Sequence, residues 1–363
     1  MTRTSRSRLS RILPFGLLIF LLLLGSPAFA DQANVFIYHR FNDPRYPSTN
    51  ISLQDFRAHL ELLAQQGFNV LKLSQVVELL QQGLILPQRC AVITVDDAYR
   101  SFLSGAWPLL KEYGYPATLF VSTDTVGKGG YLDWQELRLL QAEGVEIGNH
   151  SASHAYLLDR LVSENEADWT ARISEELVRS QQDFEDQLGS SPKLFAYPYG
   201  EFSPELVELV KAAGFAAAFG QQSGVVGAGQ DLFSLPRFPM GGVYASIAEF
   251  RSKLFMKRLD VRVMSPASPV LKGENPPRLH FYLNQEVDSS SLRCFVPGQS
   301  ECRVSLVSGG EGLYEAIALR PISGRRSKYT LTASDARGNS WYWFSQLWIL
   351  PRGGEVADHS VPR

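Results

Sequence analysis

The chain has 363 residues, of which 45% are hydrophobic and 20% are charged, and its formal net charge is −2. This composition is ordinary for a globular protein with a sizeable core, and the length predicts two or three domains. The near-neutral charge gives no basic footprint of the kind that binds nucleic acid, so we expect no nucleic-acid partner.

Residues 1–30 have the features of a signal peptide. An apolar run, Ile12–Leu24, precedes Ala28-Phe29-Ala30, which has the small-x-small pattern of a cleavage site. The basic segment before the run contains four arginines: Arg3, Arg6, Arg8 and Arg11. The run is shorter than the roughly 20 residues of a membrane-spanning helix, so we expect cleavage after Ala30 and no remaining membrane span. An uncleaved anchor is the alternative, and in both cases the folded part is expected in the periplasm or outside the cell.

Short apolar strands alternate with amphipathic helices over residues 35–219. The expected strands are 35–38, 69–73, 90–96, 117–122, 145–148, 194–197 and 215–219. The expected helices are 52–66, 74–82, 107–113, 134–143, 163–188 and 204–213. This alternation is typical of parallel strands with helices outside them, and about seven such units predict a barrel-like α/β domain over residues 31–263. On the long polar helix, Glu164, Glu166, Glu175 and Glu176 are expected to form a solvated face.

The pattern changes after about Val263, where a proline-punctuated linker leads into short alternating runs. These runs predict a small all-β sandwich over residues 264–351, followed by a polar tail, 352–363. Its last strand is rich in aromatic residues, and we expect Trp341 and Trp343 to lie on one face and to pack in the core.

The three cysteines fit this organisation. Export makes a disulfide between Cys294 and Cys302 chemically sensible. Cys90 opens an apolar strand and is expected to be a buried, small hydrophobic residue and not a nucleophile.

Chemically suggestive residues follow the ends of several predicted strands. Asp96 and Asp97 end one strand, and His39, His150 and Pro198-Tyr199-Gly200 each end another. Carboxyl ends of parallel barrel strands share one face, so these side chains are expected to converge. Two adjacent aspartates alone are equally compatible with a strand-end turn, but their charges in one cleft require a cation or a proton.

The two imidazoles of His150 and His154 are four residues apart. Two imidazoles and one carboxylate suit zinc or a similar divalent ion and leave a position open, as catalytic sites do. Histidines without a ligand role, buried or on the surface, are the alternative for this segment alone.

These segments resemble the motifs of the polysaccharide deacetylases, the NodB-like carbohydrate esterases. Thr94-Val95-Asp96-Asp97-Ala98 resembles their T-F-D-D-G motif, and residues 149–154 match their H-[ST]-x-x-H motif. Residues 195–200 resemble R-x-P-Y-G, and Leu235-Pro236-Arg237 lies where a further active-site motif is expected. The resemblance covers residues 35–254 in the family's order, and it implies a distorted (β/α) barrel with a divalent metal.

The resemblance also implies roles for individual residues. Asp97, His150 and His154 would be the metal ligands, with zinc the expected ion and cobalt, nickel or iron as alternatives. Asp96 would be the general base, and the backbone N–H of Tyr199 would help to hold the oxyanion.

Three features depart from the common family pattern. No histidine lies between His154 and His280, so His39 is assigned as the general acid; it resembles the early Tyr-His motif of the branch acting on poly-β-1,6-N-acetylglucosamine. The third motif lacks its arginine, and Arg237 is assigned in its place as the residue that orients the base. Ala98 replaces a glycine, so the turn there must accept a Cβ.

The sequence therefore predicts a metal-dependent N-deacetylase that releases acetate from an N-acetylglucosamine-containing polysaccharide, its expected partner. Two alternatives are a catalytically silent sugar-binding protein on the same fold and a metal hydrolase that acts on a non-sugar amide.

Overall fold

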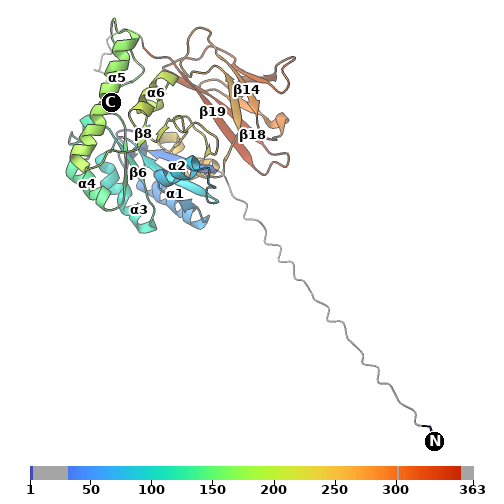
Figure 1. Cartoon of the computed structure of the whole chain (residues 1–363), viewed down its shortest axis with the longest axis horizontal. Helices are drawn as coiled ribbons and strands as arrows, with labels where there is room; N and C mark the ends of the chain where they lie inside the picture. Colours follow the sequence, from blue (N-terminus) through green and yellow to red (C-terminus); the bar gives the residue numbers. More distant parts are fainter. Residues whose placement is uncertain (3–31, 301, 353–363) are drawn as a thin grey trace.

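The computed structural model describes residues 1–2, 32–300 and 302–352, and the described residues from 32 onward form two parts (Figure 1). The predicted signal peptide, apart from its first two residues, and the predicted tail beyond Arg352 lie outside the described residues. Within the part of the chain that is described, no helix has both the length and the apolar character needed to cross a membrane.

The first part is built on a nine-stranded sheet whose main path runs β10-β1-β5-β6-β7-β8-β9. Its strands are β1 (Gln32–Tyr38), β4 (Asn69–Val70), β5 (Cys90–Val95), β6 (Thr118–Val121), β7 (Glu146–Asn149), β8 (Leu194–Ala196), β9 (Ala217–Phe219), β10 (Val226–Gly227) and β11 (Phe238–Pro239). All neighbours from β1 to β9 along this path are parallel. β5 is buried along its whole length, as its apolar and β-branched sequence predicts for a strand covered on both faces.

One segment brings the two ends of this sheet together. Leu235 forms a parallel bridge with Phe219 of β9, and three residues later β11 pairs in parallel with β1. The segment 235–239 therefore spans the gap between β9 and β1, and the predicted (β/α) barrel is confirmed. Arg237 lies in the middle of this closing segment.

Helices cover the outside of the barrel, and Figure 1 shows α3, α4 and α5 along its outer edge. The helices are α1 (Leu53–Gln65), α2 (Leu73–Gln81), α3 (Trp107–Tyr113), α4 (Trp134–Ala142), α5 (Glu166–Leu188), α6 (Pro204–Ala212) and α7 (Ile247–Leu254). Ser52 caps α1 by accepting a hydrogen bond from the Asp55 N–H at 3.0 Å, and Phe56 and Leu60 of this helix are fully buried. The predicted amphipathic helix is thus confirmed. A short parallel pair, β2 (Arg40–Phe41) and β3 (Asn50–Ile51), lies between β1 and α1.

The second part, called the β-domain below, has one eight-stranded sheet in the order β12-β19-β18-β15-β16-β17-β14-β13. Its strands are β12 (Lys257–Arg258), β13 (Val261–Ser265), β14 (Arg278–Leu283), β15 (Arg293–Phe295), β16 (Cys302–Leu306), β17 (Tyr314–Ala318), β18 (Arg326–Ser334) and β19 (Trp341–Ile349). Strands β12 and β13 lie at opposite ends of this order but are separated by only Leu259 and Asp260 in the chain, so the sheet curls round on itself.

The separate all-β domain is confirmed, and the sheet already includes residues from Lys257. The boundary at Val263 stays a prediction. Cys294 and Cys302 form the expected disulfide, and Cys90 is free and buried in β5.

The aromatic side chains of strand β19 pack in two different places. Trp348 is buried in the β-domain core, whereas Trp343 packs edge-on against Phe238 of the barrel with ring centroids 5.8 Å apart. The expectation that Trp341 is a core residue is wrong, because its side chain is 48% exposed. Strand alternation predicted that Trp341 and Trp343 share a face, but not that the barrel covers only one of them.

Gly148 in β7 tests how tightly the barrel packs below the strand ends. A Cβ at this position would overlap the ring of Phe120, which is fully buried. We expect Gly148→Ala to lower the free energy of unfolding by about 1–3 kcal/mol, measured by denaturant titration. Gly129→Ala is the control, because a Cβ there meets no atom within 4 Å and should change stability by less than about 0.5 kcal/mol. Equal effects of the two substitutions would contradict the prediction.

Candidate active site

The residues singled out in the sequence meet at the carboxyl ends of the barrel strands. Asp96 and Asp97 directly follow β5, and His150 directly follows β7. Tyr38 of β1 lies opposite Val95 of β5 in the register. Because both strands run in the same direction, His39 follows β1 where Asp96 follows β5.

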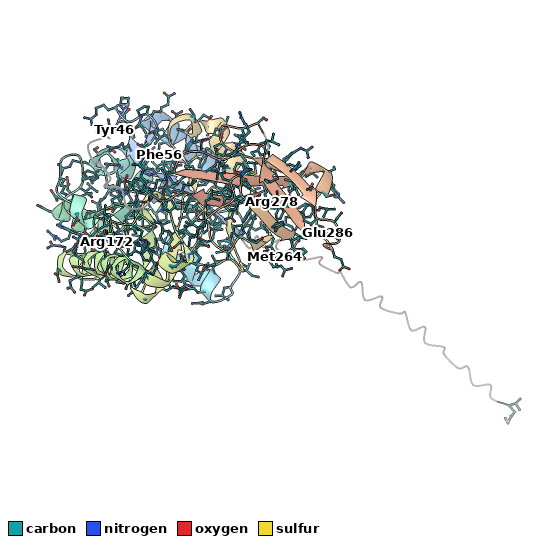
Figure 2. The ribbon with its side chains drawn as sticks, turned by 90° about the horizontal axis from the view of Figure 1, so that it is seen from above. Tyr46, Phe56, Arg172, Met264, Arg278 and Glu286 are labelled. Carbon is teal, nitrogen blue, oxygen red and sulfur yellow. A yellow bond between two sulfur atoms is a disulfide. The ribbon has the colours of Figure 1, made fainter. Side chains whose placement is uncertain are left out.

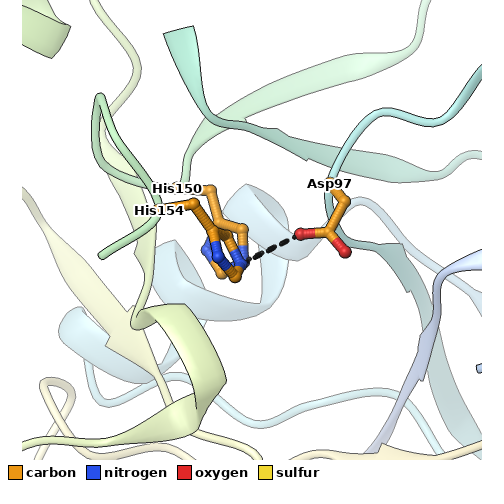
Figure 3. Close-up of side chains that lie close together, drawn as sticks. All are labelled: Asp97, His150 and His154. Atoms are coloured by element: carbon orange, nitrogen blue, oxygen red, sulfur yellow. Dashed lines mark ion pairs between the residues drawn. The ribbon is translucent and has the colours of Figure 1, made fainter. Parts of the chain in front are cut away.

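Asp97, His150 and His154 form a compact cluster, shown in Figure 3. Their ligand-type atoms lie within 4.8 Å of one another. The Nε2 atom of His154 lies 3.1 Å from Oδ1 of Asp97, and Nε2 of His150 lies 3.5 Å from the same oxygen. One carboxylate oxygen thus faces two imidazole nitrogens from another loop.

The environment of His150 sets its tautomer. Its Nδ1 lies 2.7 Å from the carbonyl oxygen of Ala196 on β8, and a carbonyl can only accept, so Nδ1 carries the proton. Burial lowers the pKa of His150 to about 4, so the ring is neutral at neutral pH. Its buried Nε2, which has no hydrogen-bond partner, therefore presents a lone pair toward Asp97. Two acceptors facing each other in a buried site fit a bound cation, and a backbone carbonyl behind a histidine is the usual support of a metal ligand.

The loop that carries His154 is fixed by polar contacts. Glu176 of α5 accepts hydrogen bonds from the backbone N–H groups of Ala152 and Ser153, at 3.1 and 2.6 Å. The Ser151 hydroxyl oxygen accepts one from the His154 N–H at 3.0 Å. The expectation that Glu176 belongs to a solvated face is wrong: its side chain is only 13% exposed because it caps this loop. Helical periodicity placed it on a polar face but did not show what covers that face.

Asp96 is fully buried and is held by Arg237 through two parallel hydrogen bonds. The distances are 2.7 Å from Nη1 to Oδ1 and 2.9 Å from Nη2 to Oδ2. Arg237 is also fully buried and donates from Nε to the carbonyl of Gly220 at 3.0 Å. Burial would raise the pKa of Asp96, but the charge of Arg237 outweighs burial and holds this pKa below its ordinary value. Arg237 thus contacts Asp96, the residue that it is expected to orient, and its role in the reaction stays a prediction.

Asp97 also stays ionised in spite of its burial. Burial opposes ionisation, but the hydrogen bond and charge of His154 are stronger, and the pKa of Asp97 lies far below its ordinary value. The imidazole of His39 acts in the same direction. His39 contributes in the same way to Asp96, which shows that it lies within electrostatic reach of both carboxylates.

Tyr199 lies on a short turn (Pro198–Gly200) that follows β8. Its backbone has φ 59° and ψ 4°, the left-handed region that a tyrosine rarely adopts. Its ring packs edge-on against His154 with centroids 4.7 Å apart and stacks on Tyr156 at 3.8 Å. The turn after β8 is thus in contact with the histidine cluster.

Left-handed backbone conformations of residues other than glycine cluster at this site. Among the described residues, the following five belong to it: Asp97, Ala98, Ser151, His154 and Tyr199. Ala98, which stands where the family motif has glycine, adopts φ 54°, so the turn accepts its Cβ in a strained conformation. Such strain is typical of functional sites, where the surrounding structure imposes the geometry.

A cavity of about 820 Å³ is lined by residues of the segments that follow β1 and β5. The guanidinium of Arg40 is sandwiched there between the rings of Tyr46 and Tyr99, at 3.7 and 3.4 Å from their centroids. Tyr131 packs against Tyr99 and also lines the cavity. Aromatic and polar groups in a concave surface are typical of small-molecule and sugar sites.

The barrel and the side chains at its carboxyl end define a candidate barrel enzyme. Residues 85–218 match the family model described as polysaccharide deacetylase, so the chain carries a polysaccharide deacetylase domain, as its motifs predicted.

Relatives and solved structures agree with this family. The poly-β-1,6-N-acetyl-D-glucosamine N-deacetylase of Escherichia coli K12 is 25% identical over 230 residues, which cover 54% of this chain and 34% of that protein. The Staphylococcus aureus MRSA252 protein of the same name is 25% identical over 214 residues, covering 57% and 73%. The structure of IcaB from Ammonifex degensii covers 62% of this chain and 98% of its own, with a TM-score of 0.55 and 24% identity. This chain spans about a third of the E. coli relative, and the structural likeness shows the barrel fold.

The Asp96–Arg237 pair generates a stability prediction. Arg237→Ala leaves a buried carboxylate without its cation, so we expect the free energy of unfolding to fall by about 3–5 kcal/mol. Arg278→Ala is the control, since Arg278 pairs with Glu274 and Glu315 on the surface and should cost less than about 1 kcal/mol. In the variant, burial without the guanidinium raises the pKa of Asp96, so the loss should be largest where this carboxylate is ionised and should shrink as the pH falls through the raised pKa. Equal losses in denaturant titrations at pH 7 would contradict the prediction.

Proposed function

We propose that this protein is a metal-dependent N-deacetylase of N-acetylglucosamine-containing polysaccharides, with the β-1,6-linked polymer as the first candidate substrate. The observation that carries the proposal is the meeting of a lone-pair-bearing His150, His154 and Asp97 beside a second, buried aspartate, Asp96. The family domain and the printed names of the two relatives support the choice of substrate class.

Asp97, His150 and His154 would hold the divalent ion, and zinc suits this set of one oxygen and two nitrogen donors. When bound, the ion would supply a Lewis acid for the amide carbonyl and would ease the deprotonation of water. Tyr199 would direct its backbone N–H toward the oxygen that becomes negatively charged.

Asp96 would accept the proton from the attacking water. It is suited to this role because Arg237 keeps it ionised and fixes both of its oxygens, and because it lies 3.8 Å from Nε2 of His150. His39, beside Asp96 in the strand register, would donate a proton to the departing amine. Water, base and acid would then act within one small pocket.

The cavity lined by the segments that follow β1 and β5 would take other sugar units of the polymer. Tyr46, Tyr99 and Tyr131 offer ring faces and hydroxyl groups, and Arg40 offers hydrogen-bond donors. The barrel (residues 31–263) would be the deacetylase domain, and residues 264–351 a separate β-domain. Export to the periplasm or beyond is part of the proposal, and the Cys294–Cys302 disulfide supports it because disulfides persist in oxidising compartments.

The direct test is acetate release from a panel of acetylated glycans: β-1,6-linked and chitin-like oligosaccharides and peptidoglycan fragments. We expect release with the zinc-loaded protein, its loss with a chelator, and its return when Zn²⁺ is added, because the ion is required for the hydrolysis. His154→Ala should lower zinc content, measured by elemental analysis, together with activity. Glycan binding without acetate release would favour a silent sugar-binding protein, and release only from simple amides would favour a different hydrolase.

His39→Ala tests the general acid. We expect kcat to fall by about 10²–10⁴-fold because the amine must then leave without a positioned proton donor, while the zinc content stays at the wild-type level. The control is His280→Ala, since His280 lies on β14 of the β-domain and pairs with Glu315. A His39→Ala protein with zinc and full kcat would remove His39 from the mechanism.

A further inference from the structure

The turn that carries Tyr199 is held by the β-domain. Arg325, the residue before β18, donates from Nε and Nη2 to the two carboxylate oxygens of Glu201, both at 2.7 Å. Its Nη1 donates to Asp159 at 2.9 Å. Glu201, two residues after Tyr199, is 1% exposed, and Arg325 is its bidentate partner. A buried fork of this kind fixes the position of both partners.

An uninterrupted stack leads from this arginine to the histidine cluster. The guanidinium carbon of Arg325 lies 3.8 Å from the centroid of the Tyr156 ring. Tyr156 stacks on Tyr199 with centroids 3.8 Å apart and an angle of 14° between the rings. The ring of Tyr199 in turn packs edge-on against His154 at 4.7 Å. A displacement of Arg325 therefore has a direct path of contacts to the candidate metal ligand.

Tyr199 needs such support because its backbone is strained. Its φ of 59° is unfavourable for a residue with a Cβ and persists only where neighbours impose it. Arg326, the first residue of β18, donates to the carbonyl oxygen of Tyr199 and lies within 5.5 Å of its ring centroid. Two consecutive arginines of the β-domain thus hold the turn from one side.

The same domain also touches the segment that closes the barrel. The indole N–H of Trp343 on β19 donates to the carbonyl of Ser223 at 3.0 Å, and the ring packs against Phe238. Phe238 is adjacent to Arg237, the partner of Asp96. The β-domain therefore contacts both the turn that carries Tyr199 and the closing segment that carries Arg237.

We propose that the β-domain completes the candidate active site, and that Arg325 is a positioning residue that holds Tyr199 in its left-handed conformation. The catalytic consequence rests on the proposed function, whereas the effect on the turn does not. Arg325→Ala leaves Glu201 buried without its cation and can prevent folding. The test therefore also uses the double variant Arg325→Met/Glu201→Gln, which removes both charges of the pair.

Hydrogen exchange of the full-length protein tests the positioning itself. The Gly200 N–H donates to the carbonyl of Tyr197 at 2.8 Å within the turn. In the double variant we expect this N–H to exchange about 10-fold faster or more, with unchanged exchange in β5. Arg278→Ala is the control, because it removes a β-domain arginine that also has two carboxylate partners. It should change exchange neither at Gly200 nor in β5. Figure 2 shows Arg278 on the β-domain, away from Tyr46 of the barrel. Unchanged exchange at Gly200 in the double variant would overturn the proposal.

Kinetics test the catalytic consequence. We expect the folded double variant to lose about 10-fold or more in kcat, because a misplaced oxyanion donor affects the transition state. The KM and the affinity for Zn²⁺ alone should stay within about threefold of wild type, which a general loss of structure would not allow. Faster exchange with a wild-type kcat would overturn the claim that the β-domain completes the active site, because the turn would then be loosened without any effect on catalysis. A wild-type protein that releases no acetate would instead refute the proposed function, and the exchange experiment would still decide the structural claim.

Discussion

The site depends on keeping two neighbouring carboxylates ionised inside the protein. Asp96 and Asp97 end the same strand, and burial favours the neutral form of both. The structure gives each a different partner: Arg237 forks onto Asp96, while His150 and His154 face Asp97. This division leaves Asp97 available to a metal ion and Asp96 available to a proton, although the two residues are adjacent in the chain.

Barrel closure provides that division. Arg237 and Asp96 are separated by 141 positions, and the fork exists only because the segment 235–239 spans the gap between β9 and β1. The guanidinium comes from this closing segment, whereas His150 follows β7. The same barrel thus places the guanidinium of Arg237 beside Asp96 and two imidazoles beside Asp97.

Much of this arrangement could be predicted from the sequence, for a physical reason. Parallel strands place their carboxyl ends on one face, so residues after β1, β5, β7 and β8 had to lie near one another once the alternation was recognised. The absence of an arginine near Ala196 also directed attention to Arg237. The supports of the site could not be predicted: Glu176 has the spacing of a solvated helix residue, and the partnership of Glu201 with Arg325 joins two domains across 124 positions. The local sequence pattern of a helix or a turn does not show which distant segment will pack against it.

These hidden supports explain how strained residues persist at the site. Each non-glycine residue held in a left-handed conformation costs of order 1–3 kcal/mol, and His154 and Tyr199 both adopt it. Glu176 offsets this cost for the histidine loop, and Arg325 with Arg326 does so for the Tyr199 turn. Both supports are charge-assisted hydrogen bonds between separate elements, and they add to the ring contacts among Tyr156, Tyr199 and His154. The barrel strands bring the reactive groups to one place, whereas contacts from α5 and the β-domain fix the conformations of the loops that carry them. In this chain, the surface that contacts the turn after β8 belongs to the β-domain.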